Sequence, residues 1–348
     1  MGGGYTSSVN AYSYATAQAL LPHVIGTNEV LLGRTTDWAA IRRHARLMLC
    51  FGGLPLKNGL ITNGGAGAGE YVPLMRAAAA AGLRFVNISP FRGDAAAFLD
   101  AEWVPIRPNT DAAMMLAMAH ALIDAGRCDR DFLARCTVGY DRFRAYVTGE
   151  SDGTPKTPEW AAAMTEVPAE TIRRLALEAA GAPTMLTATW SLQRAENGEQ
   201  PWWALVALAA MLGGIGKPGQ GGAFGYGSMN GMGTPRQDVP SVAGVPVRNP
   251  CGSYIPVARV TELLERPGGI LQYNGRDITL PDIRMIWWVG GNPFHHHQDL
   301  ARLLRGWNRT ETVIVQDPWW TAAARHADIV LPATTTLERN DIMSSSRD

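Results

Sequence analysis

The sequence has no excess of charge of either sign: Lys plus Arg and Asp plus Glu each number 31 among its 348 residues. A broad nucleic-acid surface needs clustered basic charge, so this balance argues against a nucleic-acid partner. No apolar run reaches the roughly 18 residues that a membrane span needs. The longest candidate, Trp202 to Ile215, is interrupted by Gly213 and Gly214. The sequence therefore predicts no membrane span and favours small molecules or another protein as partners.

Cysteine is scarce and scattered, at positions 50, 128, 136 and 251. No two cysteines form a C-x-x-C pair, so we expect neither an iron–sulfur cluster nor a structural zinc site in this stretch. The run His295-His296-His297 is the other metal candidate. Three consecutive side chains point in different directions on any backbone and seldom bind one ion. We therefore predict no metal ligand in this chain.

Two nucleotide-binding motifs are also missing. The glycine-rich stretch at 213–233 lacks G-x-x-x-x-G-K-[ST], which excludes a P-loop there. No clean G-x-G-x-x-G opens a helix after an apolar run, which disfavours an ordinary nicotinamide dehydrogenase.

What the sequence does have is an alternation of short apolar runs with helical patterns. Apolar residues make up 46 % of the chain, enough for sizeable cores. Alternating strands and helices predict an α/β fold with two Rossmann-like, doubly wound units and mainly parallel sheets. We place the end of a preceding segment at 1–24, the first unit at 25–185 and the second at 186–348, with a Gly-rich insertion at 213–253. Strands are expected at 47–56, 84–88, 101–106, 183–188, 284–289, 312–315 and 328–331.

Polar and charged residues follow these expected strands. In open α/β sheets, ligands bind at the carboxyl ends of the strands. The cations there suit phosphate, and Asp317 suits a ribose diol or a guanine edge. The pattern predicts a large ligand that carries a nucleotide and a pyrophosphate.

Simpler interpretations exist for several of these residues. Lys57 or Arg339 taken alone is more often a solvated charge. Asp111 could be only a helix N-cap. Trp190 and the pairs at 287–288 and 319–320 could be ordinary core residues, which is the default for tryptophan.

Six sequence strings, in order, resemble the dimethyl sulfoxide reductase family of molybdopterin oxidoreductases, in the branch of the dimethyl sulfoxide, trimethylamine N-oxide and biotin sulfoxide reductases. They are YSYATAQALLPHVIGT (12–27), RPNTDAAMMLAMAHALI (107–123), TGESDGTPKTPEWAA (148–162), WSLQRAENGEQPWWALVALAAMLGGIGKPG (190–219), IWWVGGNPFHHHQD (286–299) and WTAAARHADIVLPATTTLERND (320–341).

The resemblance implies two molybdopterin guanine dinucleotides around one molybdenum ion. Carried onto matching positions, it assigns cofactor contacts to residues that the strand ends already select. These are Lys57, Asn58, Ile88, Ser89, Asn109, Thr110, Asp111, Trp190, Ser191, Arg194, Asn292, His296, Gln316, Asp317 and Arg339. In this branch the protein ligand to molybdenum is a serine in an N-terminal segment, so the catalytic ligand is expected upstream of this chain. We therefore expect a central fragment that is inactive alone.

By resemblance, the enzyme transfers an oxygen atom from an S-oxide or N-oxide in a two-electron reduction and receives electrons from a donor protein such as a c-type cytochrome. Alternatives are another molybdopterin oxidoreductase, of the formate dehydrogenase or nitrate reductase type, or an inactive nucleotide-binding module. The sequence does not fix the compartment, although periplasmic export by a twin-arginine signal is favoured over the cytoplasm.

Overall fold

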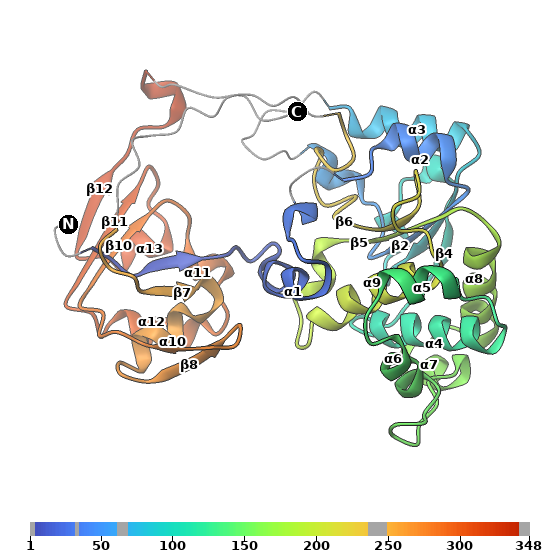
Figure 1. The fold of residues 1–348 in the computed structure, drawn as a ribbon. Helices are drawn as coiled ribbons and strands as arrows, with labels where there is room; N and C mark the ends of the chain where they lie inside the picture. The colour runs from blue at the N-terminus through green and yellow to red at the C-terminus, as the bar shows by residue number, and fades with distance from the viewer. Residues whose placement is uncertain (1–3, 32–34, 61–68, 236–248, 341–348) are drawn as a thin grey trace. The chain divides into compact units, whose positions relative to one another are not determined.

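The computed structural model describes residues 4–31, 35–60, 69–235 and 249–340 (Figure 1). The chain divides into two compact units. The larger unit comprises the described residues of 13–240, and the smaller unit comprises those of 1–12 and 241–344. Each unit is described by itself.

A parallel five-stranded sheet forms the centre of the larger unit, in the order β4-β3-β2-β5-β6. The strands β3 and β4 follow β2 in the chain and lie on one side of it. The later strands β5 and β6 lie on the other side. Every side chain of β2 and β5 is buried, because an all-parallel sheet is covered on both faces. The strands are β2 (Leu47–Phe51), β3 (Arg84–Ile88), β4 (Glu102–Val104), β5 (Thr184–Ala188) and β6 (Gly221–Phe224).

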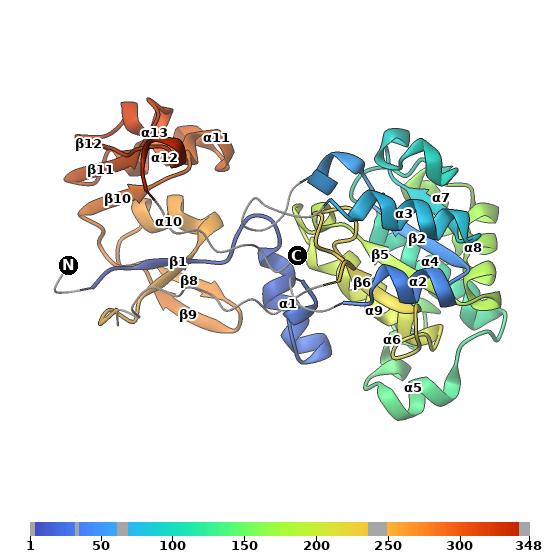
Figure 2. The same ribbon diagram turned by 90° about the horizontal axis from the view of Figure 1, so that it is seen from above.

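Helices cover both faces of this sheet (Figures 1 and 2). The helices α2 and α3 pack on the face that carries Met48 and Cys50, and α4, α8 and α9 pack on the face that carries Leu49 and Phe51. The helices are α1 (Ala15–Ile25), α2 (Trp38–His44), α3 (Tyr71–Ala80), α4 (Asp111–Asp124), α5 (Arg130–Cys136), α6 (Tyr140–Val147), α7 (Pro158–Thr165), α8 (Ala169–Gly181) and α9 (Glu199–Met211), with 3-10 turns η1 (Glu29–Leu31), η2 (Leu56–Leu60), η3 (Arg92–Asp94), η4 (Ala97–Leu99) and η5 (Trp190–Gln193).

Side-chain caps explain where several of these helices begin. Asp37 accepts from the Ala40 amide at the start of α2, and Asp129 accepts from the Phe132 amide at the start of α5. Thr157 caps α7, which carries Pro158 in its first turn. Such oxygens satisfy amides that have no partner within the helix.

The smaller unit contains three short sheets. Two are parallel, β1-β7 and β10-β11-β12, and the third is the antiparallel hairpin β8-β9 (Figure 2). The elements are β1 (Ser7–Val9), β7 (Tyr254–Pro256), η6 (Val257–Arg259), α10 (Val260–Glu265), β8 (Ile270–Tyr273), β9 (Arg276–Thr279), β10 (Met285–Val289), α11 (Pro293–His296), α12 (Leu300–Trp307), β11 (Thr312–Asp317), α13 (Ala322–Arg325), β12 (Ile329–Pro332) and η7 (Thr336–Glu338).

The predicted α/β class with mainly parallel sheets is confirmed, but the chain divides elsewhere than we expected. The expected boundary between 185 and 186 lies inside β5, which pairs with β2 and β6 in one sheet. Residues 4–12 join the smaller unit through β1, rather than ending a preceding segment. The expected insertion at 213–253 contributes β6 to the larger sheet, and its part at 236–248 lies outside the described residues. A rhythm of strands and helices does not reveal which sheet a strand joins, and this is why the boundaries differ.

Within the described parts of the chain, no helix has the length and apolar character needed to cross a membrane.

Candidate functional site

The larger sheet reverses its strand order between β2 and β5, where Phe51 lies beside Ala188. At such a reversal the connections leave in opposite directions, so a crevice opens at the carboxyl ends of the strands and ligands bind there. Gly52 begins the turn after β2 with φ +84°. A Cβ at Gly52 would lie 2.1 Å from Thr189 Oγ1, so this close approach of the two strand ends requires glycine.

The loop after β5 is held firmly by its own side chains. The buried Gln193 accepts from the Ala17 amide (2.8 Å) and donates to the Ser13 carbonyl (2.8 Å). The Thr189 and Ser191 hydroxyls lie 2.7 Å apart. Residues 13–17 and the η5 turn are therefore fixed to each other, which positions both Trp190 and Arg194.

Trp190 is buried, yet its indole Nε1 has no hydrogen-bond partner among the described residues. Its backbone amide donates to Ser228 Oγ (3.0 Å), and the Tyr14 ring lies 4.9 Å from its ring. A Cβ at Gly225 would come within 2.5 Å of Nε1. Buried donors are nearly always paired, so this N–H is a candidate donor to a ligand. The indole nitrogens of Trp202 and Trp288 also lack partners, so this observation alone does not separate Trp190 from an ordinary core residue.

Arg194 follows η5 and carries an exposed guanidinium at the same edge of the sheet. Its Nε and Nη2 each lie 3.4 Å from the Ser13 carbonyl. Among the residues that the structure describes, no carboxylate forms an ion pair with it. Neighbouring atoms desolvate the charged form and lower the Arg194 pKa. A cation whose protein partner is a neutral carbonyl suits an anionic ligand.

Lys57 and Ser89, from the ends of β2 and β3, meet at a residue that the sequence interpretation missed. Ser89 Oγ donates to Asp94 Oδ2 (2.7 Å), and Lys57 Nζ lies 3.9 Å from Asp94 Oδ1. Asp94 ends the short η3 turn, and no strand-end rule points to it. We expect Asp94 to orient Ser89, so that Ser89 presents its backbone and lone pairs rather than a free hydroxyl proton.

Asn58 and Ile88 form hydrogen bonds with other segments of the larger unit. Asn58 Nδ2 donates to the Gly227 carbonyl (3.0 Å), and the carbonyl of the buried Ile88 accepts from the Gly52 amide (2.8 Å). Any role of Ile88 toward a ligand is therefore a backbone or packing role.

The selected residues Asn109, Thr110 and Asp111 lie at the start of α4. Asn109 has φ +65°, and Thr110 Oγ1 donates to the Arg107 carbonyl (2.7 Å) instead of capping the helix. Asp111 is the first helical residue rather than the N-cap. Its side chain is only 7 % exposed, and burial raises its pKa to about 6. A carboxylate whose pKa is raised by burial, at the start of the helix that follows β4, is a candidate functional residue.

In the smaller unit, three of the selected residues lie at the carboxyl end of the β10-β11-β12 sheet. Asn292 Oδ1 accepts from the Ala323 amide (3.3 Å). The Gln316 carbonyl accepts from the Gly290 amide (3.0 Å). The buried Asp317 accepts from the Trp319 amide (2.8 Å). Arg339 Nη1 donates to the Thr334 carbonyl (3.0 Å).

The histidine run divides by exposure. His296, the selected residue, is exposed, and its ring lies 5.3 Å from the Tyr12 ring. His297 is buried, and its Nδ1 forms a hydrogen bond with the Tyr12 hydroxyl. Burial lowers the His297 pKa, and the nearby His296 lowers it further. Tyr12 is therefore a further residue of this cluster that the strand-end rule did not select.

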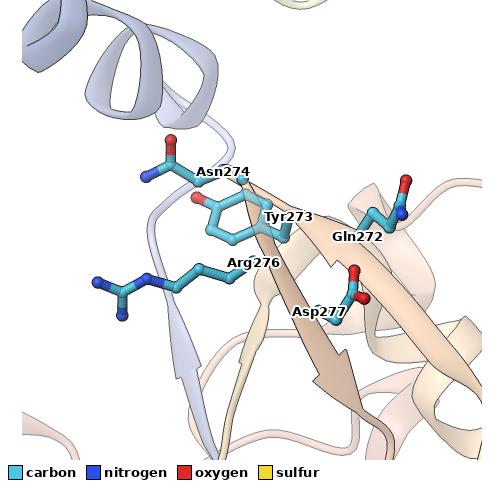
Figure 3. Close-up of a pocket in the computed structure, with 6 residues that line it drawn as sticks. Gln272, Tyr273, Asn274, Arg276 and Asp277 are labelled. Atoms are coloured by element: carbon cyan, nitrogen blue, oxygen red, sulfur yellow. The ribbon is translucent and has the colours of Figure 1, made fainter.

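A separate cavity of about 310 Å³ lies at the β8-β9 hairpin (Figure 3). Gln272, Tyr273, Arg276 and Asp277 line it, and Asn10 donates to the Tyr273 hydroxyl. Its lining comes from the hairpin alone, so we do not assign it to the strand-end site.

The selected residues thus fall into two sets, one in each unit. That both sets hold one ligand stays a prediction. The described residues contain no cluster of three or more His, Cys, Asp or Glu side chains that could hold a metal ion.

Comparison with known proteins adds a family to this geometry. Residues 43–347 match the molybdopterin oxidoreductase family. The chain is 46 % identical to a biotin sulfoxide reductase of Cereibacter sphaeroides over 99 % of its own length and 46 % of the relative. It is also 46 % identical to a dimethyl sulfoxide/trimethylamine N-oxide reductase of the same organism, and 40 % identical to a trimethylamine-N-oxide reductase of Haemophilus influenzae.

Among solved structures, acetylene hydratase from Pelobacter acetylenicus matches 91 % of this chain and 44 % of its own, with a TM-score of 0.55 and 18 % identity. This likeness concerns the fold. The chain spans less than half the length of the curated relatives that it matches.

Proposed function

The chain belongs to the molybdopterin oxidoreductase family, and we propose that it is the dinucleotide-binding part of a molybdenum enzyme that reduces an S-oxide or N-oxide. Family membership implies a molybdenum–molybdopterin cofactor. The guanine dinucleotide form, its two copies and the activity are parts of the proposal. The names of the relatives, which are S-oxide and N-oxide reductases, support the substrate class.

The observation that carries the proposal is Arg194. Its guanidinium stands at the reversal of the larger sheet with a backbone carbonyl as its protein partner. A pyrophosphate there would supply the negative charge and the acceptor oxygens that this guanidinium lacks.

Other selected residues also offer groups that fit a large dinucleotide. The buried indole N–H of Trp190 can donate to a ligand oxygen or nitrogen. Asp111 can accept from ligand N–H or O–H groups when ionised. In the smaller unit, one Asp317 oxygen accepts from the Trp319 amide, so the other can accept from a guanine edge. The residues present therefore suit the cofactor that the family implies.

In the proposed enzyme the molybdenum centre supplies the redox chemistry, by which the oxide takes up two electrons and two protons and gives the reduced compound and water. The residues of this chain bind and orient. Arg194 neutralises phosphate charge, Trp190 fixes a cofactor acceptor, and Asp317 holds the guanine. Asp94 keeps Lys57 and Ser89 in place at the neighbouring strand ends.

The proposal can be tested in a chimera that carries this chain in place of the matched stretch of the Cereibacter sphaeroides biotin sulfoxide reductase. We expect Arg194→Gln to lower molybdenum and guanine content about 10-fold or more, because the phosphate loses its cation. The molybdenum and guanine contents of Arg194→Lys should lie between those of the unmodified protein and Arg194→Gln, since lysine keeps the charge but loses the forked geometry. Metal is measured by mass spectrometry and guanine by chromatography of the denatured protein.

Arg142→Gln, at an exposed arginine on α6, is the matched control and should leave both contents unchanged. Unchanged molybdenum in the Arg194→Gln variant would contradict the assignment. Two guanines per molybdenum would support the proposed cofactor form, and one guanine would refute it. Reduction of biotin sulfoxide, dimethyl sulfoxide or trimethylamine N-oxide with a viologen donor tests the substrate class, whereas turnover of formate or nitrate would contradict it.

The proposal extends to an electron-donor protein such as a c-type cytochrome and to a periplasmic site of action. Reduction of the loaded enzyme by a purified cytochrome, and fractionation of cells that express the full gene, would test these two points.

A further inference from the structure

The three-stranded sheet of the smaller unit has one well-covered face. Ile286, Val313 and Val315 point to this face and pack in one core with Leu303 and Trp307 of α12. The Trp288 and Trp307 rings lie 5.7 Å apart in the same core. The cover on this side is complete enough to leave these strand residues almost without exposed surface.

The opposite face carries apolar side chains that remain exposed. On β10, Met285, Trp287 and Val289 are 48 %, 44 % and 66 % exposed. On β12, Ile329 and Leu331 are 47 % and 39 % exposed. The alternation of exposed and buried positions along β10 contrasts with β2 and β5 of the larger sheet, where every residue is buried.

Strand register joins these side chains into one surface. Trp287 lies opposite Ile314, and Ile314 lies opposite Ile329. We call the set Met285, Trp287, Val289, Ile314, Ile329 and Leu331 the open sheet face. It runs across all three strands. Thr312 and Gln316 of β11 lie on the same face, in register with Met285 and Val289, and no strand residue on this face is charged, so it is a mainly apolar surface rather than scattered exposed residues.

Parallel sheets in α/β proteins are covered by helices on both faces, because each crossover places a helix against the sheet. An apolar, uncharged face of this kind matches the apolar stripe of an amphipathic helix. It does not match an acidic or a basic surface, which would meet no complementary charge.

We propose that the open sheet face is the docking surface for amphipathic helical polypeptide from outside residues 1–348 of a longer protein. The length of the relatives supports this occupant, since more than half of each relative lies outside the stretch that this chain matches. The inference stands on the sheet and does not depend on the cofactor or the substrate.

Cysteine labelling tests the proposal in this chain alone and in the chimera with biotin sulfoxide reductase. Val289→Cys places a thiol on the open sheet face, and Asp277→Cys places one on the exposed β9 strand as the matched control. Both are made in a background with Cys136→Ser, because Cys136 is exposed. Maleimide should modify both thiols rapidly in this chain. In the chimera, the Val289→Cys thiol should react at least about 100-fold more slowly, because reaction requires local opening. The control thiol should keep its rate.

Equal rates for Val289→Cys in the two proteins would overturn the proposal. Protection already present in this chain, rising with protein concentration and accompanied by dimers in sedimentation, would show that a second copy covers the face and would also overturn it. If the Val289→Cys chimera does not fold, Leu331→Cys on β12 offers the same readout from the other edge. Molybdenum content is recorded in parallel, so that failure of the cofactor proposal and failure of the docking proposal remain distinguishable.

Discussion

Replacing Asp111 with asparagine should stabilise the cofactor-free larger unit at pH 7.5 by about 3 kcal/mol, which corresponds to a pKa shift of roughly two units. Burial raises the Asp111 pKa from 3.8 to about 6. A raised pKa means that the folded state holds the proton more tightly than the unfolded state. Its stabilising contribution is therefore complete below about pH 4 and is lost as the pH rises to about 6, where the buried carboxylate ionises at a cost. Asparagine removes that cost.

Urea unfolding at pH 4, 5 and 7.5 measures the effect. The free energy of unfolding of the unmodified protein should fall across this range relative to the variant, and the two curves should be parallel above pH 7. Asp131→Asn, in the exposed first turn of α5, is the control and should leave the pH dependence unchanged. The same slope in Asp111→Asn and in the unmodified protein would show that the buried carboxyl does not cause the pH dependence.

The same substitution should act in the opposite direction on the cofactor. An amide cannot supply the acceptor charge of a carboxylate, so Asp111→Asn in the chimera should lower molybdenum content while it raises the stability of the cofactor-free protein. A residue kept for structure alone would not show this opposition, which is typical of functional positions. Unchanged molybdenum content would limit Asp111 to a structural role.

Replacing Gly52 with alanine should destabilise the larger unit by about 3 kcal/mol or more, as backbone strain and overpacking add. The residue has φ +84°, which L side chains rarely adopt. Its new Cβ would also lie 2.1 Å from Thr189 Oγ1 and 2.5 Å from Leu192 Cδ1. Relief of these contacts requires the Thr189 and Leu192 side chains to shift. Because Thr189 Oγ1 also contacts Ser191 Oγ, the shift should disturb the loop that carries Trp190 and Arg194, and cofactor content should fall.

Gly26→Ala is the matched control for this prediction. Gly26 ends α1 with φ +79°, yet nothing lies within 4 Å of a Cβ there. It should lose only about 1 kcal/mol, the conformational part of the effect. Urea unfolding of both variants gives the packing part as the difference. Equal losses would show that the β2 and β5 ends do not require close approach.

Strands buried on both faces could be predicted well from sequence, because a continuous apolar run is their direct signature. The expected run at 84–88 coincides with β3, and that at 183–188 differs from β5 by one residue. The β1-β7 pair could not be predicted in this way, since a three-residue strand carries almost no periodic signal and its partner lies far along the chain. The expected division inside β5 is misplaced for another reason, because the alternation of strands and helices does not show which sheet a strand joins.

The candidate site divides along a similar line. Residues such as Asp111 and Asp317 could be selected because a parallel sheet places every strand end at one edge. Their neighbours Asp94 and Tyr12 could not be selected in this way. Asp94 contacts Ser89 from a turn, and Tyr12 contacts His297 from near the start of the chain. Trp319 and Trp320 could be core residues by the default for tryptophan, but each is 67 % exposed, because they follow the strand end rather than lie within the sheet.

The pairing of β1 with β7 has a consequence for how the chain folds. Ser7 pairs with Tyr254, which lies 247 positions later, so nearly the whole larger unit separates the two partners. During synthesis the larger unit can fold as soon as β6 emerges, whereas β1 must wait for its partner, and non-local pairing of this kind is slow. Prior folding of the inserted unit replaces a long flexible loop by a compact one and so reduces the entropy lost on closure. We therefore expect ordered assembly in refolding experiments, with exchange protection of the β2 amides appearing before that of the β7 amides.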